Sequence, residues 1–320
     1  MSKTDTFRLN MFGLPVIQTM DDFSKLSHIS KYTLYQLSVN AGRYYLTYSI
    51  KKKSGKLRTI SQPSKKLKGL QSWILTNILN KLRVSNSCKG FEPGTSIADN
   101  ARSHKGSNSL LTIDLEDFFP TITQKQVFNV FKAAGYNNTI AVAFSKICTF
   151  NETLPQGSPC SPKLANLVTW KLDVRIQGYV GKRGISYTRY ADDLSFSGLH
   201  PLKVVQILPM IKMIIEDEGF KINPSKTRIA GSARAKIVTG LILTGDTFGI
   251  GKQKFRDVRS KIYHLGLASE QRNTKLLDEV RGWLAYLNSV DSRRFIKAKK
   301  YIADLEAKYP RSLLSKIYER

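Results

Sequence analysis

The feature that most constrains this chain is a pair of adjacent aspartates in a short turn between two strand-like segments. Ile185 to Ser197 is rich in strand-forming residues on both sides of Ala191-Asp192-Asp193, which predicts a tight hairpin. A second acidic cluster, Asp114 to Asp117, overlaps the end of the apolar run Leu110 to Leu115, which predicts a buried strand. Adjacent carboxylates repel each other and are unfavourable when partly buried. The two clusters therefore require a partner that neutralises them.

A divalent cation is one such partner. Magnesium prefers hard oxygen ligands and keeps positions open for water and phosphate oxygens. Two such ions about 4 Å apart can activate an attacking hydroxyl and stabilise a leaving oxygen. We expect Asp114 and Asp192 to bridge two Mg²⁺ ions, with Asp193 assisting and the Leu115 carbonyl adding a ligand. The alternative is that these are ordinary turn residues, since aspartate is common at strand ends.

The overall charge indicates a polyanionic partner. The chain has 51 Lys and Arg against 24 Asp and Glu, a formal net charge of +27. Nucleic acid is the leading candidate, because neutralising phosphates releases counterions and drives binding. Near the C-terminus an expected helix carries a basic cluster, which is either a solvated face or a surface against a nucleic-acid duplex: Arg293, Arg294, Lys297, Lys299 and Lys300.

Periodicity and turn residues predict the remaining elements. A hairpin is expected around a tip at Ser54-Gly55, and most other segments alternate between helices and short strands. The expected helices are Leu67–Leu82, Thr123–Gly135, Ala141–Cys148, Lys163–Gln177 after Pro162, a long helix ending at Glu218 with a kink at Pro209, and the region after Lys252; further strands are expected at Phe220–Ile222 and Val238–Leu243.

Cysteine usage and hydropathy point to a reduced compartment without a membrane. Cys88, Cys148 and Cys160 lack CxxC spacing, so neither a disulfide framework nor a zinc site is expected. The N-terminal segment lacks the apolar core of a signal peptide, and no apolar run of about 18 residues occurs. We therefore expect a cytoplasmic protein with no membrane partner.

Four strings then give a specific resemblance. IDLEDFFP from Ile113, LPQGSPCSPKLANL from Leu154, YTRYADDL from Tyr187 and INPSKT from Ile222 follow the order and approximate spacing of the palm motifs of reverse transcriptases. YADD resembles the YxDD active-site hairpin of that family. The family's metal-binding and catalytic positions fall on Asp114, Asp192 and Asp193, in agreement with the charge argument.

The resemblance implies an α+β right-hand polymerase fold, with fingers, a palm built on an antiparallel sheet with packed helices, and a helical thumb. We expect the N-terminal region and fingers at 1–105, the palm at 106–250 and the basic thumb at 251–320. Part of 120–160 is expected to return to the fingers.

It also assigns a deoxynucleoside triphosphate pocket. Phe119 corresponds to a steric gate beneath the sugar, while one of Phe118 and Phe119 is expected to be a core residue. Gln156-Gly157 corresponds to a nucleotide-contacting loop. Arg58 resembles a finger arginine that grips the triphosphate. One of Lys51, Lys52 and Lys53 is expected to help, and we take Lys53 while the choice stays open. Lys226 matches a proposed general acid for the departing pyrophosphate.

Two further strings resemble the retron branch of the family. Asn100-Ala-Arg-Ser-His104 fits its NAxxH pattern, and Val238-Thr239-Gly240 fits its VTG pattern. The resemblance implies a structured noncoding RNA (msr-msd) as template and primer, and priming from the 2′-hydroxyl of an internal guanosine. The resemblance further implies that the product is branched RNA-linked DNA (msDNA) and that an effector protein encoded nearby acts with it in antiphage defence. We expect the two strings and the basic thumb, Lys252 to Arg320, to contact that RNA.

Two alternatives remain at this point. One is another reverse transcriptase, of the group II intron-like or diversity-generating type. The other is a non-catalytic RNA-binding protein on a palm scaffold, because a fold does not by itself secure an activity.

Overall fold

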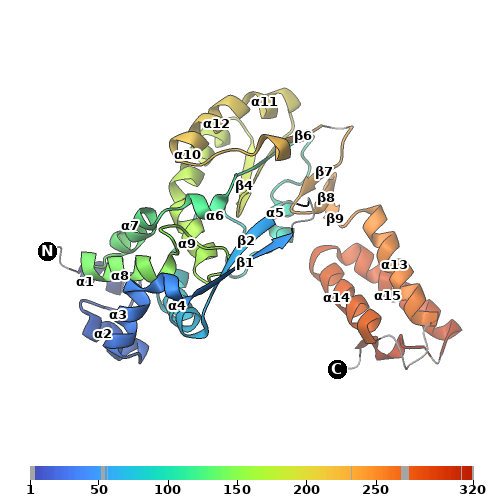
Figure 1. Cartoon of the computed structure of the whole chain (residues 1–320). Coiled ribbons are helices and arrows are strands. Elements are labelled where there is room, and N and C mark those ends of the chain that lie inside the picture. Colours follow the sequence, from blue (N-terminus) through green and yellow to red (C-terminus); the bar gives the residue numbers. More distant parts are fainter. Residues whose placement is uncertain are drawn as a thin grey trace.

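The computed structural model describes residues 4–51, 55, 57–231, 233–267, 274–310 and 312–318. Figure 1 shows three parts: N-terminal helices with a long hairpin, a central sheet with its helices, and a C-terminal helical bundle set to one side. This arrangement agrees with the expected α+β right hand. The domain boundaries at 105 and 250 remain predictions.

The fingers combine the N-terminal helices with a two-stranded hairpin. Strands β1 (Tyr45–Lys51) and β2 (Leu57–Pro63) pair antiparallel, as the sequence predicts. The Gln71 amide donates to the Ile147 carbonyl at 2.8 Å, and the Tyr136 hydroxyl donates to the Pro15 carbonyl at 3.1 Å. These bonds join the segment after residue 120 to the fingers. The helices of this part are α1 (Thr6–Met11), α2 (Met20–Ser27), α3 (Lys31–Val39), α4 (Lys65–Asn77), α7 (Gln124–Ala134) and α8 (Asn138–Cys148), with 3₁₀ turns at Ala41–Tyr44 and Leu79–Lys81.

The palm is a four-stranded sheet of order β4-β5-β3-β6, in the part of the chain that the structure describes. All three neighbouring pairs are antiparallel. Its strands are β3 (Ser109–Asp114), β4 (Ser186–Tyr190), β5 (Asp193–Gly198) and β6 (Arg228–Ala230). Its helices are α6 (Phe118–Thr121), α9 (Ser161–Val168), α10 (Trp170–Gly181), α11 (Pro201–Gln206) and α12 (Leu208–Asp217), with a 3₁₀ turn at Pro224–Lys226.

A small sheet links the palm to the thumb. Its strands are β7 (Lys236–Val238), β8 (Leu241–Thr244) and β9 (Thr247–Gly249), and α5 (Ile97–Arg102) packs against it. The thumb helices are α13 (Lys252–Leu267), α14 (Thr274–Val290) and α15 (Ser292–Lys308), followed by a 3₁₀ turn at Ser315–Tyr318.

The buried apolar residues form two clusters. One runs from Leu9 to Phe220 and unites fingers and palm. The other joins Ala98, Ala101 and Leu110 to residues 238–317. The small sheet therefore shares its core with the thumb, while β5 and most of β3 share theirs with the fingers.

Several helices are shorter than the sequence predicts. The Leu67–Leu82 helix ends at Asn77, and the Lys163–Gln177 helix breaks at Thr169, whose hydroxyl bonds the Ala165 carbonyl. The long helix before Glu218 breaks at Ile207, because Pro209 lacks an N–H and is tolerated only in the first turn of a new helix.

Two strand predictions were wrong in detail. Phe220–Ile222 forms only an isolated bridge, between Leu115 and Ile222. The single strand Val238–Leu243 is instead two strands with a turn at Thr239-Gly240, where both residues have positive φ, 45° and 82°. Two such residues in a two-residue loop suit the twist of a hairpin.

Candidate active site

The palm sheet brings the three predicted catalytic aspartates together. In the register of β3 and β5, Asp114 lies opposite Asp193. The Leu115 N–H donates to the Asp192 carbonyl at 2.9 Å, which fixes the end of β3 against the turn. Ala191 adopts a left-handed conformation with φ of 57°, which turns the chain between β4 and β5. Asp114 thus forms one acidic edge with Asp192 and Asp193, which lie 78 and 79 positions later in the chain.

The carboxylates at this edge lack full compensation for their charge. Burial raises the pKa of Asp192, and the charge of Asp114 adds to the effect. The pKa of Asp193 is raised to about 6, first by restricted hydration and then by the charges of Asp192 and Asp114. Raised values show that the site disfavours three negative charges without a nearby cation.

Lys226 supplies part of the positive charge that offsets these carboxylates. Its Nζ lies 2.8 Å from both carboxylate oxygens of Asp114, and this contact raises the pKa of the lysine. Its side chain is 56% exposed. The general-acid role of Lys226 stays a prediction, and the position of its ammonium beside Asp114 at the acidic edge suits that role.

The donor set fits Mg²⁺, although no metal cage is preformed. Within the described residues, no three His, Cys, Asp or Glu side chains are already arranged around a common ion position. Asp114 and Asp193 nevertheless offer oxygen ligands from neighbouring strands, and a bound cation would oppose the burial and the neighbouring negative charges that raise the pKa of Asp192 and Asp193. The two-ion assignment, with the Leu115 carbonyl as a ligand, remains a prediction.

The predicted gate residue lies among other aromatics beside this edge. Phe118 is buried in the core, while Phe119 is only partly buried. The Phe119 ring centroid lies 6.5 Å from that of Phe91, which in turn lies 5.9 Å from Tyr190. The sequence reasoning missed Phe91, which is 47% exposed and has φ of 60°. Nothing in its local sequence distinguishes this exposed phenylalanine from a core residue.

The predicted nucleotide loop packs against the fingers hairpin. The Gln156 carbonyl accepts a hydrogen bond from the Ser61 N–H at 2.8 Å. Gly157 has φ of 133°, and a Cβ there would lie 2.7 Å from the Ser61 carbonyl oxygen, so only glycine fits. Arg58 is exposed on the same strand, and its charge lowers the pKa of Asp192, so it acts across the site. Lys52 and Lys53 lie outside the described residues, and Lys51 is exposed at the end of β1.

A cleft of about 830 Å³ runs along the sheet from the acidic edge. Asp114, Asp193 and Lys226 line one part of it, and Thr239 and Gly240 line another. The VTG turn therefore borders the same space as Asp114 and Asp193.

The predicted RNA contacts of the NAxxH string need correction. Asn100 and His104 are 1% and 0% exposed, and Val238 is fully buried, so these side chains are not on a surface that RNA reaches. The His104 ring bonds the hydroxyls of Ser197 and Thr188 at 2.7 and 2.6 Å.

These buried groups instead connect the two retron strings. Thr188 donates to the Asn100 side-chain oxygen at 2.5 Å, and the Asn100 amide reaches the Thr239 hydroxyl at 3.5 Å. The two strings thus meet in space and tie α5 to the palm sheet and to the β7–β8 turn. Only Thr239, partly buried, and Gly240, exposed, remain available for RNA contact.

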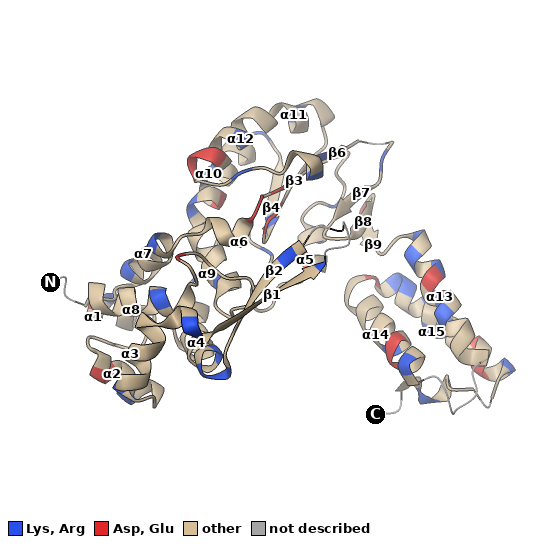
Figure 2. Cartoon of the chain, in the orientation of Figure 1, with Lys and Arg blue, Asp and Glu red and all other residues tan. Residues whose placement is uncertain are grey.

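The thumb cluster is exposed apart from one member. Arg293, Lys297, Lys299 and Lys300 are exposed on α15, where Figure 2 shows basic residues gathered. Arg294 is partly buried and pairs with Asp291 at 2.7 Å, so it supports the helix start. A second cleft of about 680 Å³ lies between α15 and the small sheet, and Lys105, Lys252, Arg293 and Lys297 are among its lining residues.

Comparison with known proteins identifies the family. The family described as reverse transcriptase (RNA-dependent DNA polymerase) matches residues 50–266. The retron Ec86 reverse transcriptase of Escherichia coli is 46% identical over 98% of this chain and 97% of its own. The retron Mx65 reverse transcriptase of Myxococcus xanthus is 30% identical over 92% of this chain and 74% of its own. Among solved structures, a telomerase from Candida albicans in complex with an RNA fragment covers 90% of this chain and 64% of its own, with 11% identity and a TM-score of 0.47. The chain belongs to the bacterial retron-type reverse transcriptases and is an RNA-directed DNA polymerase.

Proposed function

We propose that this polymerase copies a structured noncoding RNA (msr-msd) that serves as both template and primer. Synthesis starts from the 2′-hydroxyl of an internal guanosine and gives branched, RNA-linked single-stranded DNA. In the cytoplasm this product and a separately encoded effector protein form an antiphage unit. No described helix is long and apolar enough to cross a membrane.

The observation that carries the proposal is the register of β3 and β5. It sets Asp114 opposite Asp193 in a chain whose nearly full length matches a retron enzyme. Retron reverse transcriptases work with a noncoding RNA template and deoxynucleoside triphosphates, and reverse transcriptases use divalent metal ions. The raised pKa values of Asp192 and Asp193 are consistent with a site that binds cations.

Each residue then has a chemical task. Asp114, Asp192 and Asp193, with the Leu115 carbonyl, would hold two Mg²⁺ ions, and bound Mg²⁺ would supply the positive charge that activates the attacking hydroxyl and stabilises the leaving oxygen. Lys226 protonates the departing pyrophosphate. In the pocket, Phe119 limits the space at the sugar 2′ position, and Arg58 with Lys53 grips the triphosphate. The Gln156-Gly157 loop contacts the nucleotide. Thr239, Gly240 and the exposed thumb residues contact the RNA.

The test combines the purified protein, its msr-msd RNA and deoxynucleotides. We expect DNA that stays joined to the RNA and is released only by a debranching enzyme that cuts 2′–5′ linkages. Free DNA that forms only when a separate primer is added would contradict the retron mode.

A matched pair of variants tests the metal assignment. Asp192→Asn should abolish synthesis while RNA binding persists. Asp117→Asn is the control, because Asp117 is exposed in the same motif, and its left-handed φ of 42° is one that asparagine tolerates. Normal synthesis by Asp192→Asn would refute the assignment. In cells that carry the whole unit, the same variant should also lose protection against phage.

A further inference from the structure

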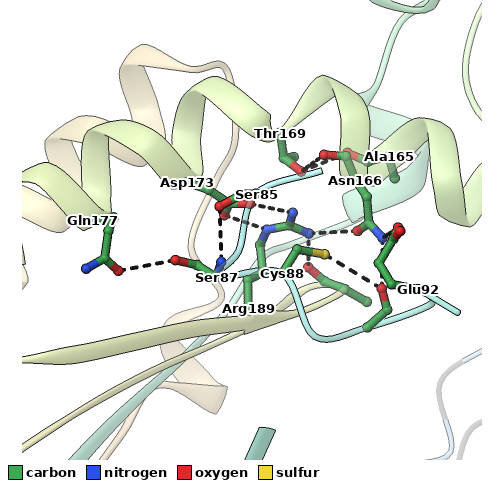
Figure 3. Close-up of polar contacts among 12 residues, drawn as sticks. Ser85, Ser87, Cys88, Glu92, Ala165, Asn166, Thr169, Asp173, Gln177 and Arg189 are labelled. Carbon is green, nitrogen blue, oxygen red and sulfur yellow. Dashed lines mark hydrogen bonds and ion pairs between the residues drawn. The ribbon is translucent and has the colours of Figure 1, made fainter. Parts of the chain in front are cut away.

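Arg189 and Asp173 (Figure 3) form a fully buried ion pair, and Arg189 also bonds the Ala191 carbonyl in the turn that carries Asp192 and Asp193. Arg189 precedes Tyr190-Ala191-Asp192-Asp193 on β4, and its guanidinium faces Asp173 on α10. Nε and Nη2 of Arg189 donate to the two Asp173 oxygens at 2.8 and 2.7 Å, and both side chains are 0% exposed. The remaining nitrogen, Nη1, donates to the Asn166 side chain at 3.1 Å and to the Ala191 carbonyl at 3.2 Å.

This contact with Ala191 reaches the turn itself. Ala191 is the residue whose left-handed φ of 57° reverses the chain, and such a conformation costs an alanine free energy that neighbouring contacts must offset. The guanidinium holds its carbonyl, while the next residue, Asp192, accepts from Leu115. The turn is thus fixed from two sides.

A loop from the fingers side completes the support. The Arg189 N–H donates to the Ser87 carbonyl and the Lys89 N–H donates to the Arg189 carbonyl, each at 2.8 Å. Gly90 lies so close to the turn that a Cβ there would be 2.8 Å from the Ala191 nitrogen.

The side chain of Asn166 links this loop to the ion pair. Its amide donates to the Gly90 carbonyl at 2.8 Å and to Glu92 at 2.9 Å, and Lys163 pairs with Glu92 at 2.5 Å. Four separate segments therefore meet at Arg189.

Such a network is not explained by stability alone. A buried ion pair loses much of its attraction to desolvation, and replacing the whole pair by well-packed hydrophobic residues of similar volume is often neutral or stabilising. The planar guanidinium of Arg189 instead fixes the relative positions of its hydrogen-bond partners, because the directions of its N–H groups are set by one rigid plane.

We propose that Arg189, with Asp173 as its anchor, is a positioning residue that sets the catalytic turn for metal-dependent nucleotide addition. The inference rests on the proposed role of Asp192 and Asp193. Because Arg189 is fully buried, it acts through the Ala191 carbonyl and the loop at residues 87–92.

Two variants remove the guanidinium of Arg189 in different ways. Arg189→Lys keeps the charge but cannot reach Asp173, Asn166 and the Ala191 carbonyl together. Arg189→Gln combined with Asp173→Asn removes both charges, while the two amides can pair with each other. The asparagine that replaces Asp173 also still offers an oxygen to the Tyr187 hydroxyl, which donates to Asp173 at 2.8 Å.

Arg175→Gln is the matched control. Arg175 lies on the same helix and pairs with Asp217 and Glu218 at 2.8 and 2.6 Å, but these contacts lead to α12 and not to the turn. It reports what losing a multivalent arginine pair on α10 does by itself.

Three measurements are made on each protein. Thermal unfolding and RNA binding report the fold. Single-turnover kinetics give the maximal rate of nucleotide addition and the apparent nucleotide affinity. Electron paramagnetic resonance measures Mn²⁺ bound to a complex with matching nucleotide and a primer that lacks its 3′-hydroxyl, so that no reaction occurs.

We expect the maximal rate to fall about 10- to 100-fold in both Arg189 variants, because small displacements of reacting groups have effects of this size. Mn²⁺ affinity should fall several-fold, while RNA binding stays unchanged and the Arg175 control retains full rate and affinity.

The inference is overturned if either folded Arg189 variant keeps the wild-type rate and Mn²⁺ affinity. It is also overturned if both variants fail to fold, since the network would then serve the core. Asp192→Asn, measured in parallel, distinguishes failure of the proposed function from failure of this inference. Normal activity in Asp192→Asn would refute the proposed function, whereas normal activity only in the Arg189 variants would refute only this inference.

Discussion

The buried His104 should make the stability of this enzyme depend on pH in a way that can be calculated. Burial lowers the pKa of His104 from 6.5 to about 4. The Thr188 hydroxyl already donates to Asn100, so it must accept from Nε2–H of His104, and Nδ1 accepts from Ser197. A second proton, on Nδ1, would turn this nitrogen from an acceptor into a donor, and its hydrogen bond from the Ser197 hydroxyl would be lost.

The linkage between protonation of His104 and folding gives the direction and the size of the change in stability with pH. The unfolded chain binds a proton near pH 6.5 and the folded chain only near pH 4, so stability is fully present above the higher value and falls as the pH drops. A shift of about 2.5 units corresponds to about 3 kcal/mol in full. Between pH 7.5 and pH 5 we expect a loss of about 2 kcal/mol from this one residue.

The assay compares wild type with His104→Gln, which offers a donor and an acceptor but does not titrate. Urea unfolding at a series of pH values gives the difference in unfolding free energy between the two proteins, and titrations common to both cancel. Wild type should lose its advantage over the variant as the pH falls from 7.5 to 5. A difference that stays constant across this range would refute the buried neutral histidine.

Three further predictions concern the active site and the thumb. Phe119→Val should lower the preference for deoxynucleotides over ribonucleotides, measured as the ratio of kcat/KM values; an unchanged ratio would exclude the gate role. Lys226→Gln should lower the rate of nucleotide addition about 100-fold with little change in nucleotide affinity, and a rate close to wild type would show that Lys226 only neutralises Asp114. Arg293→Gln combined with Lys297→Gln should weaken RNA binding and reduce the dependence of log affinity on log salt concentration by about one for each phosphate that is no longer neutralised. Lys212→Gln, on the exposed face of α12, is the control. A salt dependence equal to that of wild type would show that the RNA binds elsewhere.

The local patterns predicted many elements because they depend on neighbouring residues. Thr123 begins α7 with a capping box and Gly135 ends it with φ of 118°, as their residue types indicate. The hairpin around Ala191 forms as predicted. The position of Asp114 opposite Asp193 comes instead from the pairing of β3 with β5, two segments far apart in the chain. Helix breaks were harder to predict, because at Thr169 the apolar pattern continues through the interruption.

What the sequence by itself determined is the chemistry: which carboxylates, aromatics and cations the chain carries, and the order of the motifs that identify its family. What only the tertiary structure decided is where each side chain points. Asn100 and His104 were expected to contact RNA, yet they are buried. Asn100 bonds Thr239 of the VTG turn, and His104 bonds Ser197 and Thr188 of the palm sheet. Arg189, which the sequence did not single out, became the support of the catalytic turn. Burial and long-range hydrogen bonds depend on residues far apart in the chain, and no local pattern encodes them.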